Sequence, residues 1–175
     1  MTKRFTNTLD HGHEPPSETP ITLAFRNVLT TMHAFVNAER DLEDIAYSRD
    51  PAYAVWAADT EQAHENLAEA LGVVHSLPAE FREDRPLKRM ALLADAMIGH
   101  EVPGGARDLH LQMHMVFFTK FQAAGLSSTA MHRNGLLIHA RHLVNAMISL
   151  PLFDGSPIEE APFNDGLPDE VWFDF

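Results

Sequence analysis

The sequence predicts an all-α protein, an up-and-down antiparallel bundle of four to five helices with an extended C-terminal tail. Three observations predict it. Apolar residues recur every three or four positions across residues 19–150. Proline, glycine and serine divide this stretch into helix-length pieces joined by short connections, and short connections favour antiparallel neighbours. No alternation typical of β-strands competes with the helical period before residue 150.

The expected helices can be placed from residues that favour helix ends. Thr19 suits a capping position and Pro20 suits a first helical position, so the first helix should run from about residue 19 to 47. A second Pro signal starts the next helix, which should run from about residue 50 to 75. The third follows residues 83–86 and ends near residue 99, the fourth follows residues 103–105 and ends at Gly125, and the fifth runs from Ser127 to before Pro151.

The two ends of the chain differ from this body. Residues 1–18 are polar and contain a Pro-Pro pair, so we expect a flexible arm before the bundle domain of residues 19–150. Residues 151–175 hold four prolines, seven acids and neither Lys nor Arg. The large rings in this acidic tail favour either a strap across the bundle or a contact with a partner. The expected partner-binding residues are Phe163, Trp172, Phe173 and Phe175.

Composition limits the class of protein. A chain of 175 residues with 45% hydrophobic residues is long enough to bury the core of one domain. The chain has no cysteine, which excludes disulfides and thiolate metal ligands. The net charge of −12, without a concentrated cationic run, predicts no direct binding to nucleic acid. Without a long apolar run or a hydrophobic N-terminal segment, we expect a cytoplasmic protein that does not bind membranes.

One group of polar residues is expected to face the middle of the bundle. Glu39 and Glu43 fall within the apolar arc of the first helix, and a buried carboxylate is costly unless it is paired, neutral or bound to a cation. The next helix carries the Glu-x-x-His half-motif of bundle metal sites. Counted from the intervening turns, these positions and two later histidines lie at similar depth. The hypothetical Fe, Mn or Zn centre comprises Glu39, Glu43, Glu61, His64, His114 and His139.

A simpler interpretation takes each of these residues separately. The segment LHLQMHMVFF places His110 and His114 four positions apart in an apolar run, and core histidines commonly bond to backbone or hydroxyl groups. Glu39 and Glu43 can pair with Arg89 or Arg133. A di-metal bundle also needs a second Glu-x-x-His, which the sequence lacks.

The sequence therefore predicts a non-enzymatic helical interaction protein: an adaptor, regulatory subunit or inhibitor that acts through its acidic surface and aromatic tail. The expected partner is a protein, a homodimer is an open alternative, and no cofactor is required. Two other functions stay open. One is a metalloenzyme or metal-binding bundle that uses the Glu/His centre. The other is a small-molecule-binding bundle with a cavity among Met32, Met97, Met113 and Phe117.

Overall fold

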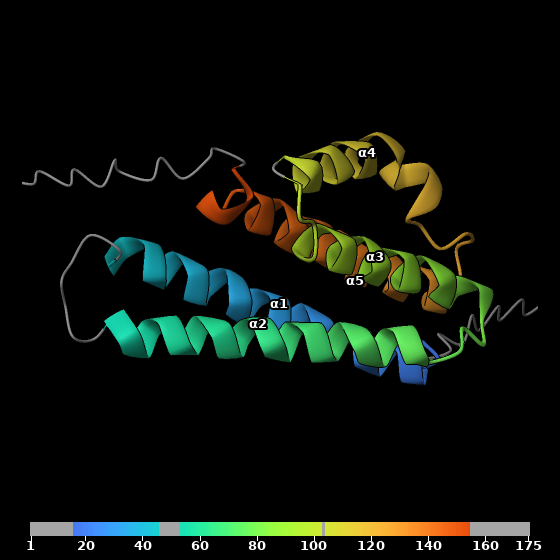
Figure 1. The fold of residues 1–175 in the computed structure, drawn as a ribbon. Coiled ribbons are helices and arrows are strands. Elements are labelled where there is room, and N and C mark those ends of the chain that lie inside the picture. The colour runs from blue at the N-terminus through green and yellow to red at the C-terminus, as the bar shows by residue number, and fades with distance from the viewer. Residues whose placement is uncertain (1–15, 46–52, 103, 155–175) are drawn as a thin grey trace, which may run out of the picture.

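The computed structural model describes residues 16–45, 53–102 and 104–154, and these residues form five α-helices and no strand. Successive helices run in opposite directions (Figure 1), so the prediction of an all-α, up-and-down antiparallel bundle is confirmed. Most of the expected arm and tail lies outside the described residues. The helices are α1 (Pro20–Ile45), α2 (Tyr53–Ser76), α3 (Arg85–Ile98), α4 (Gly105–Lys120) and α5 (Ser128–Ile148), with 3₁₀ turns η1 (Arg82–Asp84) before α3 and η2 (Pro151–Phe153) after α5.

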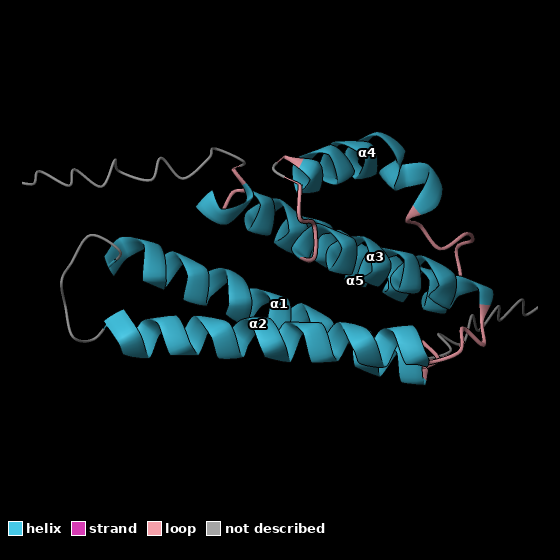
Figure 2. Ribbon diagram, viewed as in Figure 1, coloured by secondary structure: helices cyan, strands magenta, loops and turns pink. Residues whose placement is uncertain are grey.

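The helices form three layers (Figures 1 and 2). The α1–α2 hairpin makes the first layer, and α3 and α5 pack on it through contacts of α1 with α3 and α5 and of α2 with α3. Helix α4 lies over α3 and α5, on the side away from the hairpin (Figure 1). Within the described ranges no helix is long and apolar enough to cross a membrane.

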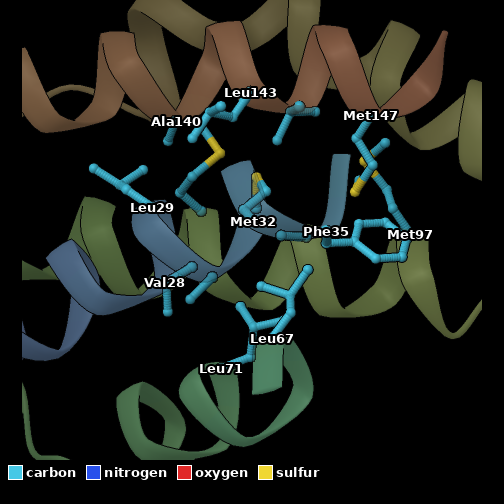
Figure 3. Close-up of a cluster of buried hydrophobic side chains, with 14 of the residues drawn as sticks. Val28, Leu29, Met32, Phe35, Leu67, Leu71, Met97, Ala140, Leu143 and Met147 are labelled. Carbon is cyan, nitrogen blue, oxygen red and sulfur yellow. The ribbon is translucent and has the colours of Figure 1, made fainter. Parts of the chain in front are cut away.

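The core lies between the hairpin and the α3–α5 layer. The apolar residues of α1 recur at helical spacing, so their side chains point to one side of the helix. Side chains from α1, α2, α3 and α5 converge there (Figure 3). Seven residues of the arc that the sequence predicts for the first helix are buried: Ile21, Phe25, Val28, Leu29, Met32, Phe35 and Val36.

The free end of the α1–α2 hairpin extends past the ends of α3 and α5 (Figure 1). No other helix of the described ranges covers the apolar side of the hairpin at this end. Glu43, which the sequence predicts to lie within the apolar arc of the first helix, is therefore exposed, and so is Trp56 of α2. Helical periodicity shows which face of a helix is apolar, but not how far a neighbouring helix reaches along it.

The end of α4 differs from the expected boundary. The sequence predicts a helix as far as Gly125, but α4 ends at Lys120. The side chain of Asn134 in α5 accepts a hydrogen bond from the Ala123 N–H at 2.8 Å and donates to the Ala123 carbonyl at 3.1 Å. A residue held in this way by another helix cannot continue the intrahelical pattern. Gly125, with φ of +105°, instead lies in the turn to α5.

A buried ion pair joins three segments of the fold. Arg133 of α5 donates from Nε to Asp84 Oδ1 at 2.9 Å, and both side chains are at most 1% exposed. The same guanidinium donates from Nη2 to the backbone oxygen of Ser17 at 2.7 Å. This arginine therefore holds η1, α5 and the segment before α1 together. The sequence had suggested that Arg133 can pair with Glu39 or Glu43. In the structure its partner is Asp84 instead.

The last described residues belong to the packed body. The side chains of Leu150 and Phe153 are buried in the core cluster. Asp154 forms an ion pair with Arg107, near the start of α4. The packed part of the chain thus continues a few residues past the predicted boundary at residue 150, and residues 155–175 lie outside the description.

Candidate functional site

Helix α4 is apolar on two opposite faces. Its inner face contributes Ala106, Met113 and Phe117 to the core. On its outer face, Leu111, Met115 and Phe118 are 60%, 71% and 67% exposed. The spacing i, i+4, i+7 places these three side chains on one line along the helix, and we call them the α4 stripe. A surface helix of a monomer normally has one apolar face, so the second face marks α4 as a candidate contact surface.

Charge also separates the α4–α5 half from the rest of the molecule. Residues 102–153 contain a single acid, Asp108, against the four bases Arg107, Lys120, Arg133 and Arg141. The net charge of this segment is +3 within a chain of net charge −12. Of the four bases, Arg133 is buried against Asp84 and Arg107 pairs with Asp154, so Lys120 and the half-buried Arg141 carry the remaining positive charge of this half.

Beside the stripe, a hydrogen-bonded network joins α4 to α5. The Nε2 atoms of His110 and His114 lie 2.8 Å and 3.0 Å from Asn145 Oδ1. Arg141 Nη2 lies 3.1 Å from Nδ1 of His114. Since a guanidinium only donates, Nδ1 of His114 must be the unprotonated nitrogen, and its Nε2–H donates to Asn145. The asparagine oxygen therefore accepts from both rings, whose centroids are 4.5 Å apart.

Arg141 connects this network to the stripe. Its guanidinium carbon lies 4.8 Å from the centroid of Phe117 and 5.6 Å from that of Phe118. Cation–π contacts of this length favour a fixed position of the rings. Among the described residues, Nε of Arg141 is buried and has no hydrogen-bond partner. The position of this side chain therefore depends on its packing against the two rings as well as on its bond to His114. One ring of the stripe is thus held in place by α5.

These contacts define the role of the two histidines of α4. His110 and His114 are half-buried, and each is bonded to the side chain of Asn145. Their role in the described structure is to pack α4 on α5. The simpler interpretation expected a polar partner for each ring, although it did not identify an asparagine shared by both.

The hypothetical metal ligands are spread over several surfaces. Glu43, Glu61, His64 and His139 are exposed, and Glu39 is half-buried. Burial raises the pKa of Glu39, and the nearby His64 partly opposes that increase. Among the described residues, no three His, Asp or Glu side chains are arranged to hold a metal ion. The metal hypothesis stays a prediction without a supporting geometry.

The structure also shows where the hypothetical metal ligand His139 and the expected small-molecule cavity lie. His139 lines an open hollow of about 540 Å³ between α1 and α5, together with Arg26, Leu29 and His33. The four side chains expected to line a small-molecule cavity do not border this hollow. They are packed in the core: Met32, Met97, Met113 and Phe117.

Comparison with known proteins adds no assignment. No family model matches the chain, and no curated protein or solved structure matches it. The fold defines the class of protein as an all-α antiparallel bundle. The features that bear on the function of this protein are those of its own surface.

Proposed function

We propose that this chain is a non-enzymatic helical interaction protein that binds an acidic, apolar segment of a partner protein on the outer face of α4. The observation that carries the proposal is the α4 stripe. Scattered exposed apolar residues are ordinary on protein surfaces. The three residues of the stripe lie on one line of one helix and are 60% to 71% exposed. A row of this kind can receive the apolar side chains of a bound segment.

Electrostatics supports an acidic partner. The α4–α5 half has one acid, Asp108, and its bases Arg107 and Lys120 lie toward the two ends of α4. Arg107 is paired with Asp154 and lies beside Asp108, so the positive charge available to a bound segment is that of Lys120 at the C-terminal end of α4. A segment with carboxylates and apolar anchors would meet apolar surface along the stripe and positive charge at this end.

Rigidity supports the same proposal. Arg141 lies over Phe118, and the shared contacts of Asn145 hold α4 on α5. A surface whose side chains are already positioned loses less conformational entropy when a partner binds. Phe118 therefore suits the role of an anchor better than an unsupported exposed ring.

Residues 155–175 have the chemistry that the stripe should bind. They contain six acids, no Lys or Arg, and the rings that the sequence analysis assigned to partner contact. The described chain stops at Asp154, which pairs with Arg107 near the start of α4. A peptide of this sequence is therefore a defined probe for the proposed surface. Whether the natural occupant is this segment or one from another protein is an outcome of the experiments below.

The experiment measures binding of a synthetic peptide of residues 155–175, with a fluorescent label, to a chain shortened to residues 1–154. The shortened chain keeps every residue of the described core, and its thermal unfolding is compared with that of the full chain before binding is measured. Replacing Leu111, Met115 and Phe118 with Gln should weaken binding at least about tenfold, since three apolar contacts are lost. A peptide with its acids replaced by Asn and Gln should bind more weakly and with less dependence on salt.

A matched control separates the stripe from general hydrophobicity. Leu23, Val73 and Leu92 are 54%, 45% and 51% exposed on other helices, and their replacement with Gln should leave binding unchanged. Equal loss in the two triple variants, or no saturable binding of the acidic peptide, would contradict the proposal. Sedimentation of the full chain at several concentrations then shows whether residues 155–175 act within one chain or between two copies.

A further inference from the structure

A second surface feature lies where the start of α3 meets the turn after α4. A hollow of about 290 Å³ opens there, and Arg82, Arg85 and Arg89 line it together with Thr119 and Gln122. None of its lining residues is acidic. The hollow is separate from the α4 stripe, so what it binds is independent of the function proposed above.

The three arginines are spaced to converge. Positions 82, 85 and 89 follow i, i+3 and i+7, which places them on one side of η1 and α3. All three side chains are exposed. Arg89 donates from Nη1 to the Lys120 carbonyl, a contact that fixes its guanidinium at the end of α4. The side chains of Arg82 and Arg85 make no hydrogen bond or ion pair with any residue that the structure describes.

No described carboxylate forms an ion pair with these arginines, although Glu83 lies between Arg82 and Arg85 in the sequence. Of the residues three or four positions from Arg85, three are basic (Arg82, Lys88 and Arg89) and the other is Phe81. The residues at the same spacing from Arg89 include no acid. Asp84 lies close in sequence, but its carboxylate is buried against Arg133. Like charges at i, i+4 destabilise a helix, and cations at its N-terminal end oppose the helix dipole.

This arrangement is unfavourable for the fold alone, in a protein that has 25 acids with which to neutralise it. A bound anion of at least two charges removes the repulsion. Guanidinium groups pair with phosphate oxygens through two parallel hydrogen bonds, and three of them match the three terminal oxygens of a phosphate group. The Gln122 amide adds a neutral donor at the rim.

We propose that this hollow binds the phosphate group of a small phosphorylated metabolite. A volume of about 290 Å³ is at the lower end for small-molecule sites, which suits a phosphate with a small organic part rather than a large cofactor. Phosphoserine in a peptide offers the same terminal group from another source. The experiment therefore includes one arm for each source.

The experiment titrates the full chain with inorganic pyrophosphate in 20 mM and 150 mM NaCl, and it follows amide resonances of residues 82–89 and 119–124 by NMR. Saturable shifts confined to these residues, still present at the higher salt, are the expected result. Arg85→Gln and Arg89→Gln should each weaken pyrophosphate binding about tenfold or more, since each removes a charged hydrogen-bonding partner. Arg89→Lys keeps the charge without the planar fork and should give an intermediate loss.

Arg40→Gln is the matched control, because Arg40 is exposed on α1 and the substitution makes the same change in charge. It should bind pyrophosphate like the wild type. Thermal unfolding gives a second readout. Without phosphate, Arg85→Gln should unfold at the same or a slightly higher temperature than the wild type, and pyrophosphate should stabilise the wild type and Arg40→Gln far more than Arg85→Gln. Shifts that do not saturate, or an equal response of Arg40→Gln and Arg85→Gln, would overturn the proposal.

Two further arms identify the source of the phosphate group. A small sugar phosphate should compete with pyrophosphate in the wild type. A phosphoserine peptide that binds through Arg85 and Arg89 far more tightly than the sugar phosphate would overturn the assignment to a metabolite. Displacement of pyrophosphate by the unphosphorylated peptide of residues 155–175 would also overturn it, because the hollow would then serve carboxylates of the chain itself.

Discussion

The α1–α2 hairpin and the α4–α5 half follow opposite designs. The described parts of α1 and α2 carry eight acids against two bases, whereas α4 and α5 carry one acid against four bases. The apolar residues of α1 lie mainly on one arc, and that arc is buried. Those of α4 lie on two faces, of which one stays exposed. The comparison teaches that the most regular apolar face of a helix is the face that packs into the core. A second apolar face on the same helix points to binding of a partner rather than to folding.

The two halves also differ in how their helices are held. Around α1 the packing is mainly apolar (Figure 3), with polar contacts of Arg26 with His132 and of Thr60 with the Ala38 carbonyl. Between α4 and α5, polar contacts of Asn134, Arg141 and Asn145 accompany the apolar ones. Hydrogen bonds specify orientation more narrowly than apolar contact does, so this interface fixes one position of α4. The buried Arg133–Asp84 pair then connects the α5 side to the segment before α1.

The largest effect is expected from breaking that connection. Arg133→Ala leaves the Asp84 carboxylate buried without its cation and removes the bond to Ser17. The free energy of unfolding should fall by about 3–5 kcal/mol, measured by urea denaturation. Glu18→Ala is the control, because its ion pair with Arg26 is exposed and should contribute at most about 1 kcal/mol. Similar losses in the two variants would show that the buried pair has no special role.

A smaller effect should come from the polar interface of α4 and α5. Asn145→Ala removes the acceptor that His110 and His114 share, so two half-buried N–H groups lose their partner. We expect a loss of about 1–3 kcal/mol, with faster amide hydrogen exchange in α4 than in α1. Asn37→Ala breaks an exposed contact with His33 and should cost much less. Equal exchange in α4 for the two variants would contradict the proposed role of Asn145.

Acidification should distinguish the two halves further through His132. Burial lowers the pKa of His132 below its ordinary value of 6.5, and Arg26 and then Arg133 lower it more, against a smaller opposing effect of Glu18. A lowered pKa means that the fold favours neutral imidazole. The stabilisation is therefore present above pH 6.5 and is lost as the pH falls below it. Between pH 7.5 and 5, the Tm of the wild type should fall by about 1–2 °C more than that of His132→Gln.

The smallest effect is expected at Glu39, on the acidic half. Burial raises its pKa, with His64 opposing the increase, so ionised Glu39 costs stability as the pH rises above the ordinary value of 4.5. Glu39→Gln should raise Tm by about 1 °C at pH 7, and this difference should vanish below pH 4. Glu43→Gln, at an exposed position, is the control in the same thermal scans. A decrease in Tm for Glu39→Gln at pH 7 would contradict the assignment.

Parts of the candidate site were within reach of the sequence. The run LHLQMHMVFF showed that α4 is apolar over most of its surface, and its two histidines were expected to need polar partners. Asn145 could not be named as that partner, because the pairing of residues 31 and 35 positions apart depends on how α4 is rotated against α5. The sequence did not single out Arg82, Arg85 and Arg89, because Glu83 and Asp84 stand among them, and only the turn after α4 makes these arginines line a hollow.

The sequence by itself determined the helical class, the antiparallel order and the inner face of α1, because these follow from local periodicity, capping residues and short connections. The tertiary structure alone decided that the α1–α2 hairpin extends past its neighbours, that Arg133 is buried against Asp84, and that the outer face of α4 stays uncovered. The physical reason is that rotation and relative reach of packed helices depend on the combined shape of all their side chains, which no single helix encodes.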